Sequence, residues 1–515
     1  MLVLTASQMK KAEQNAVDLG MSWLRLMENA GSAAAKEIRN GFDLKDKKTV
    51  IVCGKGNNGG DGYVIARKLH ENGISTKVVS VGMPSTESAK EMYSKVTTIG
   101  IRPLDFEAYE SLCCQYIADA DIIIDALFGT GFSGAPKGIY GVAIAAMEGA
   151  SATKIAIDIP SGIDSDKGQT DYPFLKADMT VTFAAYKPCH LSCPSNEYCG
   201  KTVVASIGIP DEAYSGIAPY LKTVTENEAS ALLPKRSVNC HKGICGTAGM
   251  YVGSKGYSGA AVIAIRAAVK SGVGIANAII PDSIYPIIGA TVPEAVCTVL
   301  NGSAEQGIDF NDSKAIVKAM NNCTVGLIGC GLGQSRYSAY NVKQIMREAN
   351  IPLVIDADGI NILSDSIELI RNYPSEVIIT PHPKEAARLL KCEVDEIQSD
   401  RVSAALRLSE LTGAVTVLKG AGTLIATPDG GCRIVTDGNP AMSTAGTGDM
   451  LAGMAVAFAA QGLTMDKTAL LAVKMHAMCG DLTLKTSSLL SLTPTDMLEN
   501  LPRVISNLYN DLYNK

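Results

Sequence analysis

From Thr49 onward, short runs of apolar and β-branched residues alternate with longer stretches that have helical periodicity. Apolar runs bounded by polar turns are typical of strands buried on both faces of a parallel sheet, and apolar positions three and four residues apart are typical of helices. The predicted strands are TVIVCG, TKVVSVG, ADIIIDAL, KIAIDIP and MTVTFAA, and the clearest helices between them are GYVIARKLHENG and YGVAIAAMEGA. This alternation predicts a doubly wound α/β domain.

The alternation loosens after GKTVVASIGIP and then resumes as a second series. Its predicted strands are GMYVGS, GIANAIIP, CTVGLIG, PLVIDA, EVIITP, AVTVLKG and TLIATP. A chain of 515 residues is also longer than one hydrophobic core ordinarily supports. We therefore expect two α/β domains, residues 1–215 and 226–515, with a soft boundary within residues 212–230, where no charge run or low-complexity linker marks it.

Composition narrows the class of protein. The balance of 46 Lys+Arg against 52 Asp+Glu gives no support to a nucleic-acid surface. The N-terminus has too short an apolar run for a signal peptide, and no apolar run of about 20 residues predicts a membrane span. The 14 cysteines are scattered, which favours reduced thiols in a cytoplasmic protein. Metal binding by Cys189, Cys193 and Cys199 is an alternative that lacks a C-x-x-C pair.

A glycine-rich turn, CGKGNNGGDG, follows the first predicted strand. Gly54, Gly56 and Gly59 satisfy G-x-G-x-x-G, but the next strand ends without the acid that a dinucleotide fold uses to hold a ribose. We expect a helix from about Gly62 whose free N–H groups face an anion. The oxygens of Asn57, Asn58 and Asp61 are also suited to a monovalent cation. The alternative is a capped strand-to-helix turn without a ligand.

Two further turns follow later strands of the same predicted sheet. DALFGTGFSG spans residues 125–134, and IDIPSGIDSDKG spans residues 157–168 and brings Asp158. Because ligands of open α/β sheets bind outside the carboxyl ends of the strands, the three turns predict one pocket. Asp158, beside a proline-fixed turn, is the candidate functional carboxylate of this pocket.

The order LMENAG, G-x-G-N-N-G-G-D-G, DALFGTG and IPSGID, across nearly all of residues 1–215, resembles the epimerase domain of the bifunctional NAD(P)HX repair enzymes. That resemblance implies interconversion of the two C6 epimers of hydrated NADH or NADPH (NADHX and NADPHX). It implies a potassium ion near Asn58, Asp125 and Ser161. The implied substrate contacts are Asn57, Asn58, Gly59, Gly60, Asp61, Gly129, Thr130, Gly131, Phe132, Ser133, Gly134, Ala135 and Asp158. Asp158 is the candidate acid/base, although a carboxylate there could instead only orient the substrate.

In the second half, NPAMSTAGTGDMLAG places a small-residue turn at the start of an apolar helix. Backbone N–H groups at a helix start stabilise the charge that develops in phosphoryl transfer. Asp449, directly after the turn, is placed to take the proton of an attacking hydroxyl. The alternative is a structural N-cap aspartate.

This turn resembles the anion hole and base of the ribokinase-like superfamily. The superfamily's sugar and vitamin kinases carry Asn-x-x-Glu where this chain has His382 and Glu385. With that difference, the second half of the chain resembles the C-terminal NAD(P)HX dehydratase domain. The other segments that carry this resemblance are HKGICGTAG, YSGAAVIAIRAAVKSGVG, GCGLGQS and IDADGIN. The fold class expected for the chain is therefore α/β with two domains, an N-terminal Rossmann-like doubly wound sheet and a C-terminal ribokinase-like domain.

The second resemblance implies nucleotide-driven removal of the added water. Asp449 would activate the hydroxyl, Ala260, Gly331 and His382 would contact the hydrate, and Mg²⁺ would be held indirectly by Glu385. The implied contacts to ADP or ATP are Lys419, Gly420, Ala421, Gly422, Thr423, Asn439, Pro440, Ala441, Met442, Ser443, Thr444, Ala445, Gly446, Thr447 and Gly448.

Four positions depart from the family pattern. Cys330 replaces a proline, and Lys384, Ala441 and Ala445 replace glycines. Ala445 matters if its position needs a positive φ.

Two other functions remain open at this point. A vitamin-type kinase fused to a dinucleotide-binding regulatory domain would accumulate a stable phosphorylated product. A non-catalytic binding module would have a degraded pocket, which the retained Asn57, Asn58, Asp61, Asp125 and Asp158 do not favour. A homo-oligomer is possible, because closed homo-oligomers are common among soluble enzymes.

Overall fold

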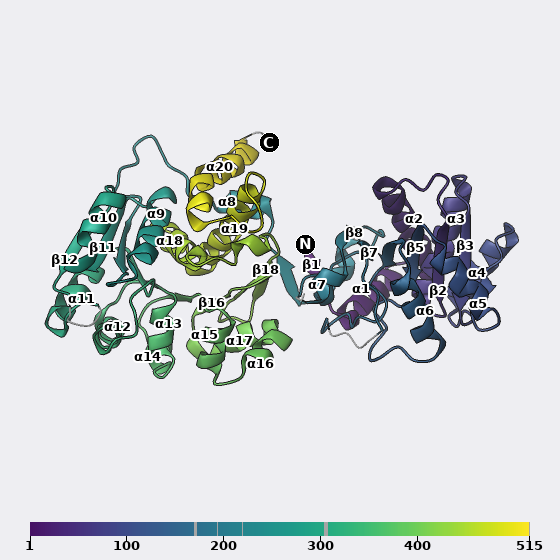
Figure 1. Cartoon of the computed structure of the whole chain (residues 1–515), viewed down its shortest axis with the longest axis horizontal. Coiled ribbons are helices and arrows are strands. Elements are labelled where there is room, and N and C mark those ends of the chain that lie inside the picture. The colour runs from purple at the N-terminus through teal and green to yellow at the C-terminus, as the bar shows by residue number, and fades with distance from the viewer. Residues whose placement is uncertain (169–172, 193, 219, 303–306, 514–515) are drawn as a thin grey trace. The chain divides into compact units, whose positions relative to one another are not determined.

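The structure, a computed structural model, describes residues 1–168, 173–192, 194–218, 220–302 and 307–513. The chain divides into two compact units, Met1–Leu221 and Lys222–Lys515 (Figure 1). Residues 216–221 belong to the first unit and residues 222–225 to the second. Among the described residues, no helix combines the length and the apolar character needed to cross a bilayer.

The first unit is built on a parallel sheet with the strand order β4-β3-β2-β5-β6-β7-β8. The strands are β2 Thr49–Gly54, β3 Thr76–Val81, β4 Leu104–Asp105, β5 Ile122–Ala126, β6 Thr153–Ile157, β7 Met179–Phe183 and β8 Lys201–Ala205, with a short β1 at Leu2–Val3. The doubly wound prediction is confirmed. The strand order reverses between β2 and β5, and such a switch point leaves a crevice at the carboxyl ends of the strands.

Helices cover both faces of this sheet. Their bounds are α1 Ala6–Asp18, α2 Trp23–Gly41, α3 Asn57–Glu71, α4 Glu87–Thr98, α5 Glu110–Ala118, α6 Ile139–Gly149 and α7 Ser195–Tyr198. Apolar side chains of α2, α3 and α4 pack on one face, and those of α5 and α6 pack on the other. The two-sided burial explains why the strands are continuous apolar runs in the sequence.

The expected start of the helix after the first glycine turn is wrong. The helix α3 begins at Asn57 rather than near Gly62, so Asn57, Asn58 and Asp61 lie in its first turns. The glycines that suggested a loop instead allow the helix to pack very closely on its neighbours. A Cβ on Gly59 would lie 1.8 Å from the carbonyl oxygen of Gly54.

The second unit contains a larger sheet with the strand order β9-β18-β17-β16-β15-β14-β13-β10-β11-β12. The strands are β9 Leu221–Thr223, β10 Thr247–Tyr251, β11 Ile275–Pro281, β12 Val296–Leu300, β13 Val325–Ile328, β14 Leu353–Ile355, β15 Val377–Ile379, β16 Val415–Leu418, β17 Thr423–Ala426 and β18 Cys432–Val435. The pairs from β12 through β16 are parallel, while β17 is antiparallel to both of its neighbours. All seven predicted strands are present; β9, β12 and β18 were not predicted.

The helix α18, buried from Met450 to Ala460, packs against α9 and α19 in the second unit. The bounds of the helices in this unit are α8 Glu226–Leu232, α9 Ser258–Lys270, α10 Tyr285–Thr291, α11 Ser313–Asn321, α12 Arg336–Glu348, α13 Asp358–Leu363, α14 Glu368–Arg371, α15 Pro383–Leu390, α16 Val394–Ser399, α17 Arg401–Thr412, α18 Thr447–Ala460, α19 Met465–Leu484 and α20 Pro494–Tyr513. A Cβ on Gly453 would lie 2.1 Å from the carbonyl oxygen of Ala264, so α18 and α9 are in near-backbone contact. This packing fixes the start of α18 at the sheet edge.

Two candidate active sites

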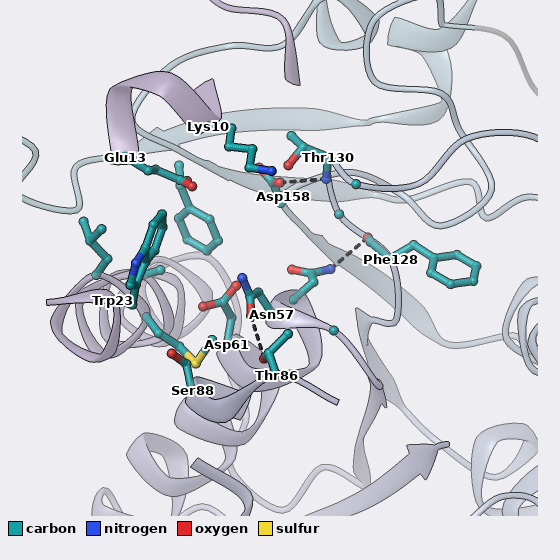
Figure 2. A pocket seen from close by; sticks show the side chains of 18 of the residues that line it. Lys10, Glu13, Trp23, Asn57, Asp61, Thr86, Ser88, Phe128, Thr130 and Asp158 are labelled. Atoms are coloured by element: carbon teal, nitrogen blue, oxygen red, sulfur yellow. Dashed lines mark hydrogen bonds between the residues drawn. The ribbon is translucent and has the colours of Figure 1, made fainter. Parts of the chain in front are cut away.

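A cavity of about 780 Å³ opens at the switch point of the first sheet (Figure 2). It is lined by α1, by the start of α2, by the first turns of α3 and α4, and by the turn after β5. Asp158 and Phe183, from the ends of β6 and β7, complete it. The three turns singled out in the sequence therefore converge on one cavity.

Asp158 occupies a strained position on the wall of the cavity. Its φ of 66° is left-handed, a conformation that costs a non-glycine residue about 1–3 kcal/mol and that concentrates at functional sites. One carboxylate oxygen accepts from Thr182 Oγ1 at 3.0 Å and from Lys187 Nζ at 2.6 Å, and the other accepts from the Thr130 amide at 3.3 Å. Burial opposes the charge, but Lys187 outweighs it and lowers the pKa of Asp158. Asp158 is therefore an ionised, rigidly held carboxylate.

Lys187 is the principal functional residue that the sequence prediction missed. Its side chain is 1% exposed, and its ammonium donates to Asp158, to Thr182 Oγ1 at 2.8 Å and to the Phe183 carbonyl at 3.1 Å. A buried lysine is rare unless it is paired, and all three of its donors are used here. The sequence feature that could have indicated Lys187 is its position just beyond a strand that ends at the ligand-binding edge of the sheet.

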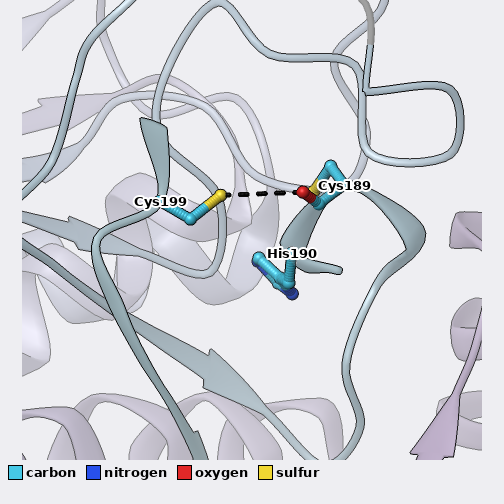
Figure 3. Close-up of side chains that lie close together, drawn as sticks. All are labelled: Cys189, His190 and Cys199. Carbon is cyan, nitrogen blue, oxygen red and sulfur yellow. Dashed lines mark hydrogen bonds between the residues drawn. The ribbon is translucent and has the colours of Figure 1, made fainter. Parts of the chain in front are cut away.

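The segment after Lys187 supports Asp158 from behind. The His190 ring accepts from the Lys187 amide at 3.0 Å through Nδ1, and Nε2 lies 2.9 Å from the Asp158 carbonyl oxygen. Cys189 and Cys199 lie beside His190, and the Cys199 thiol donates to the Cys189 carbonyl (Figure 3). Because both ring nitrogens have partners, His190 braces the loop and offers no lone pair to a metal. Cys193, the third member of the group considered in the sequence, lies outside the described residues.

The residues implied as potassium ligands lie in one buried network. Asp125 accepts from the amide of Ser161 at 2.8 Å and from its hydroxyl at 2.7 Å. Asn58 donates to the carbonyls of Phe128 and Ile157, while its own Oδ1 is buried and has no hydrogen-bond partner among the described residues. Burial raises the pKa of Asp125 to about 6, although the bonds from Ser161 oppose the shift. An orphaned amide oxygen near a buried carboxylate fits a monovalent cation.

The predicted substrate contacts of the first unit divide into three groups. Asn57, Asn58, Asp61, Gly129, Thr130, Gly131 and Phe132 line the cavity. Gly59 and Gly60 are buried beneath it, while Ser133, Gly134 and Ala135 are exposed and do not line it. The two buried glycines serve helix packing rather than direct contact with a ligand.

Gly59→Ala is expected to destabilise the first unit by about 3 kcal/mol or more, because its Cβ would overlap the Gly54 carbonyl. Gly56→Ala is the matched control in the same turn, since a Cβ there meets nothing within 4 Å. Urea unfolding followed by circular dichroism measures both. Equal midpoints for the two variants would show that the helix–strand packing is not required.

The second candidate site lies at the carboxyl ends of β13, β14, β15 and β16. Lys419 Nζ is 2.7 Å from Asp356 Oδ1, which also accepts from Thr380 Oγ1 at 2.6 Å. Burial opposes the charge on Lys419, but Asp356 and Glu385 raise its pKa. Asp356, the first aspartate of IDADGIN, was not predicted as a site residue, although it follows a buried strand at the ligand-binding edge.

Asp449 faces this ion pair from the first turn of α18. Its carboxylate, that of Asp356 and the Cys330 thiol bring ligand-type atoms within 4.8 Å of one another. Burial and the neighbouring Asp356 raise the pKa of Asp449 to about 6. A half-buried carboxylate with a pKa near that of a neutral-pH base is suited to accept a proton from a hydroxyl. Cys330 donates to Asp356 at 3.9 Å, so the residue that replaces the family's proline joins the polar network.

In the turn that leads into α18, Gly446 is the residue that adopts a left-handed backbone conformation. The φ of Gly446 is 100°, whereas Ala441 and Ala445 are not among the residues with positive φ. The two alanine departures are therefore compatible with the backbone. A Cβ on Gly448 would lie 3.3 Å from Lys419 Nζ, so its absence leaves room at the helix start. At the N-terminus of α18 the positive end of the helix dipole therefore lies beside the Lys419 ammonium, and this combination favours anion binding.

The other predicted contacts of the second site lie on several loops. Gly331 and Ala260 are neighbours, since a Cβ on Gly331 would lie 2.9 Å from the Ala260 Cβ. The Glu385 carboxylate accepts from the His382 amide at 2.8 Å, and His382 Nδ1 accepts from Lys384 and Glu385, which forms a capping box. Burial raises the pKa of Glu385 to about 7.

The predicted nucleotide contacts lie on three segments. Lys419 to Gly422 form the turn between β16 and β17, whereas Ser443, Thr444 and Ala445 are exposed before α18. The side-chain amide of Asn439 donates a hydrogen bond to the Asp481 carboxylate at 2.9 Å. This bond stabilises the turn that contains Asn439.

Comparison with known proteins agrees with this division of the chain. Residues 24–189 match the family model described as YjeF-related protein N-terminus, and residues 248–503 match the model described as NAD(P)H-hydrate dehydratase. The Bifunctional NAD(P)H-hydrate repair enzyme Nnr of Thermofilum pendens is 33% identical over 99% of this chain and 97% of its own length.

Solved structures resemble the second unit. The ADP/ATP-dependent NAD(P)H-hydrate dehydratase of Bacillus subtilis, co-crystallised with ATP and Mg²⁺, is 30% identical with a TM-score of 0.50, over 56% of this chain and 99% of that chain. A ribokinase-like superfamily protein of Enterococcus faecalis is 26% identical with a TM-score of 0.51, over 56% and 96%. The fold and the sites define a two-domain α/β enzyme with a Rossmann-like unit and a ribokinase-like unit. The chain belongs to the family of bifunctional NAD(P)H-hydrate repair enzymes.

Proposed function

We propose that this chain repairs hydrated nicotinamide cofactors. The first unit interconverts the R and S epimers of NADHX and NADPHX, and the second unit dehydrates the S epimer to NADH or NADPH at the expense of ADP or ATP. The observation that supports the proposal is that each unit has a buried carboxylate–lysine ion pair at its sheet edge, Asp158 with Lys187 in one and Asp356 with Lys419, beside Asp449, in the other. A binding module or a regulatory domain would not need either arrangement.

In the first unit, the substrate's hydrated ring lies against Asp158. Asp158 accepts or returns a proton at the C6 hydroxyl, and Lys187 keeps it ionised between these events. The Thr130 amide and Thr182 hydroxyl fix the direction of the carboxylate, so little reorganisation accompanies proton transfer. Asn58, Asp125 and Ser161 would hold a potassium ion, which would supply positive charge near the turn that shapes the cavity.

Replacing potassium by sodium or choline at constant ionic strength is expected to lower the epimerisation rate several-fold and to leave dehydration of the S epimer unchanged. The physical reason is that the buried Asn58 Oδ1 has no hydrogen-bond partner in the described part of the chain and is available to coordinate the ion. Thermal unfolding gives a second readout, because a bound ion raises the melting temperature. Equal rates and melting temperatures in all three salts would refute the potassium site.

In the second unit, Asp449 takes the proton of the C6 hydroxyl, and the N-terminus of α18 stabilises the negative charge that develops beside it. Lys419 lies at the same helix start, where its charge complements phosphate oxygens. ADP or ATP with Mg²⁺ supplies the phosphoryl group that turns the hydroxyl into a good leaving group. Asp356 holds Lys419 in place, so the sequence-predicted nucleotide turn and the predicted base act in one site.

The test of this half uses purified S-NADHX with Mg²⁺ and either ADP or ATP, followed at 340 nm. NADH formation that depends on the nucleotide supports the dehydratase. A stable phosphorylated product from a vitamin alcohol, with no NADH formed, would favour the vitamin-kinase alternative instead.

The free thiols of the described cysteines favour a reducing compartment, and we infer that the protein acts in the cytoplasm.

A further inference from the structure

The cavity of the first unit contains a further carboxyl group, that of Glu13. It lies on α1, lines the cavity and is half-buried, and Figure 2 shows its side chain directed into the space that Asp158 and Asp61 also face. Glu13 makes no hydrogen bond or ion pair with any described residue. A half-buried carboxyl without a protein partner faces whatever occupies the cavity.

The pKa values of Asp158 and Glu13 are shifted in opposite directions. Lys187 lowers the pKa of Asp158, whereas burial raises the pKa of Glu13 to about 7, with Lys187 opposing and Asp158 reinforcing the shift. Asp61, on α3, shares the cavity and its pKa is held well above its usual value by burial, Asp158 and Glu13. The other titratable groups that face Glu13 are Lys10 on its own helix, which also lines the cavity, and Tyr214.

Inversion at C6 through loss and return of water needs two proton transfers on two faces of the ring. On one face the C6–O bond breaks and the oxygen leaves with the bonding electrons, so it must receive a proton to depart as water. The nitrogen lone pair forms the C6=N1 bond of a planar cation. On the other face a water adds to C6 and must lose a proton. Two carboxyl groups on different elements of the cavity, one with a lowered and one with a raised pKa, match this requirement.

We propose that Glu13 is a catalytic residue of the epimerase site, exchanging a proton with the C6 oxygen on the ring face opposite Asp158. This inference rests on the proposed epimerase function. In one direction Glu13 gives its proton to the departing hydroxyl, and Asp158 takes the proton of the incoming water. This leaves Glu13 ionised and Asp158 protonated, so Asp158 returns a proton to solvent and Glu13 takes one up before the next turnover in that direction. In the other direction the two carboxyl groups exchange roles, and no redox partner is involved.

The experiment compares Glu13→Gln with wild type and with Asp18→Asn in the full-length protein. Asp18 lies on the same helix, is exposed and does not line the cavity, so it controls for the loss of one negative charge. Interconversion of purified R and S epimers is followed by chromatography without nucleotide, across pH 5 to 9. Dehydration of the S epimer is the internal control for an intact second unit.

We expect Glu13→Gln to lower kcat for epimerisation about 100-fold or more with little change in KM, and Glu13→Asp to recover part of it. The limb of the wild-type pH profile near pH 7 should disappear in Glu13→Gln and persist in Asp18→Asn. In ¹⁸O-labelled water, label should enter the C6 hydroxyl with each wild-type turnover and more slowly in Glu13→Gln.

Two results would overturn the assignment, and they are distinguishable. Active wild type with an equally active Glu13→Gln and the same pH profile would remove Glu13 from the mechanism and leave the epimerase intact. Wild type that interconverts the epimers no faster than the spontaneous reaction would refute both the epimerase function and the catalytic role of Glu13.

Discussion

Asp449→Asn is expected to lower the rate of nucleotide-dependent dehydration about 10³-fold, because the variant keeps the shape of the site and removes its base. KM for the nucleotide should change little, since Lys419 and the helix start remain. In wild type, kcat/KM should fall tenfold per pH unit below about pH 6. Burial and Asp356 raise the pKa of Asp449 to about 6, and a base is inactive when protonated.

The matched control is Asp466→Asn, at the start of α19, which changes the same charge near a helix N-terminus away from the site. Absorbance at 340 nm with purified S-NADHX and Mg-ATP measures all three proteins. If Asp449→Asn dehydrates the substrate at the wild-type rate, the carboxylate is a structural N-cap and the base is a different group.

Lys187→Met should abolish most epimerisation and also destabilise the first unit. Removing Lys187 leaves Asp158 buried without its counter-charge, and breaking a buried ion pair costs about 3–5 kcal/mol. The pKa of Asp158 would rise, so the carboxyl would be protonated at neutral pH and unable to accept a proton. We expect a loss of about 10²-fold or more in the epimerisation rate, measured by chromatography of the two epimers, and a lower urea midpoint.

A double variant separates the two effects. Lys187→Met with Asp158→Asn removes both charges, so stability should largely return while epimerisation stays lost. Lys201→Met, at the start of β8, is the control for loss of an exposed lysine. Full activity of Lys187→Met would contradict the assignment of Lys187 as the group that keeps Asp158 ionised.

The strands and the general place of both sites could be predicted from sequence because they depend on local pattern. Strands such as β2 and β14 are short apolar runs, and the turns after them fall at one sheet edge by topology. The strand β12 was harder to identify because its residues are half-buried or exposed, which weakens the apolar signal. The start of α3 was misplaced because three glycines read as a loop, whereas their role is close tertiary packing.

The residues missed at the sites share a different cause. Lys187 and Asp356 act through partners 29 and 63 positions away in sequence, and spacing alone does not reveal such pairs. Glu13 lies on α1, before the segment that the N-terminal family model covers, and carries no motif of its own. The question about Ala445 also needed coordinates, because only the backbone angles show that the turn requires glycine at Gly446 instead.

The central claim is that one chain performs both repair steps, and purified R-NADHX tests it most directly. With Mg²⁺, K⁺ and ATP or ADP, NADH should form from the R epimer well above the rate set by spontaneous epimerisation, because the first unit converts R to S and the second dehydrates S. The rise at 340 nm should fall to the spontaneous limit in Asp158→Asn and fall about 10³-fold in Asp449→Asn. NADH formation from the R epimer no faster than spontaneous epimerisation in wild type, or none from the S epimer, would contradict the account.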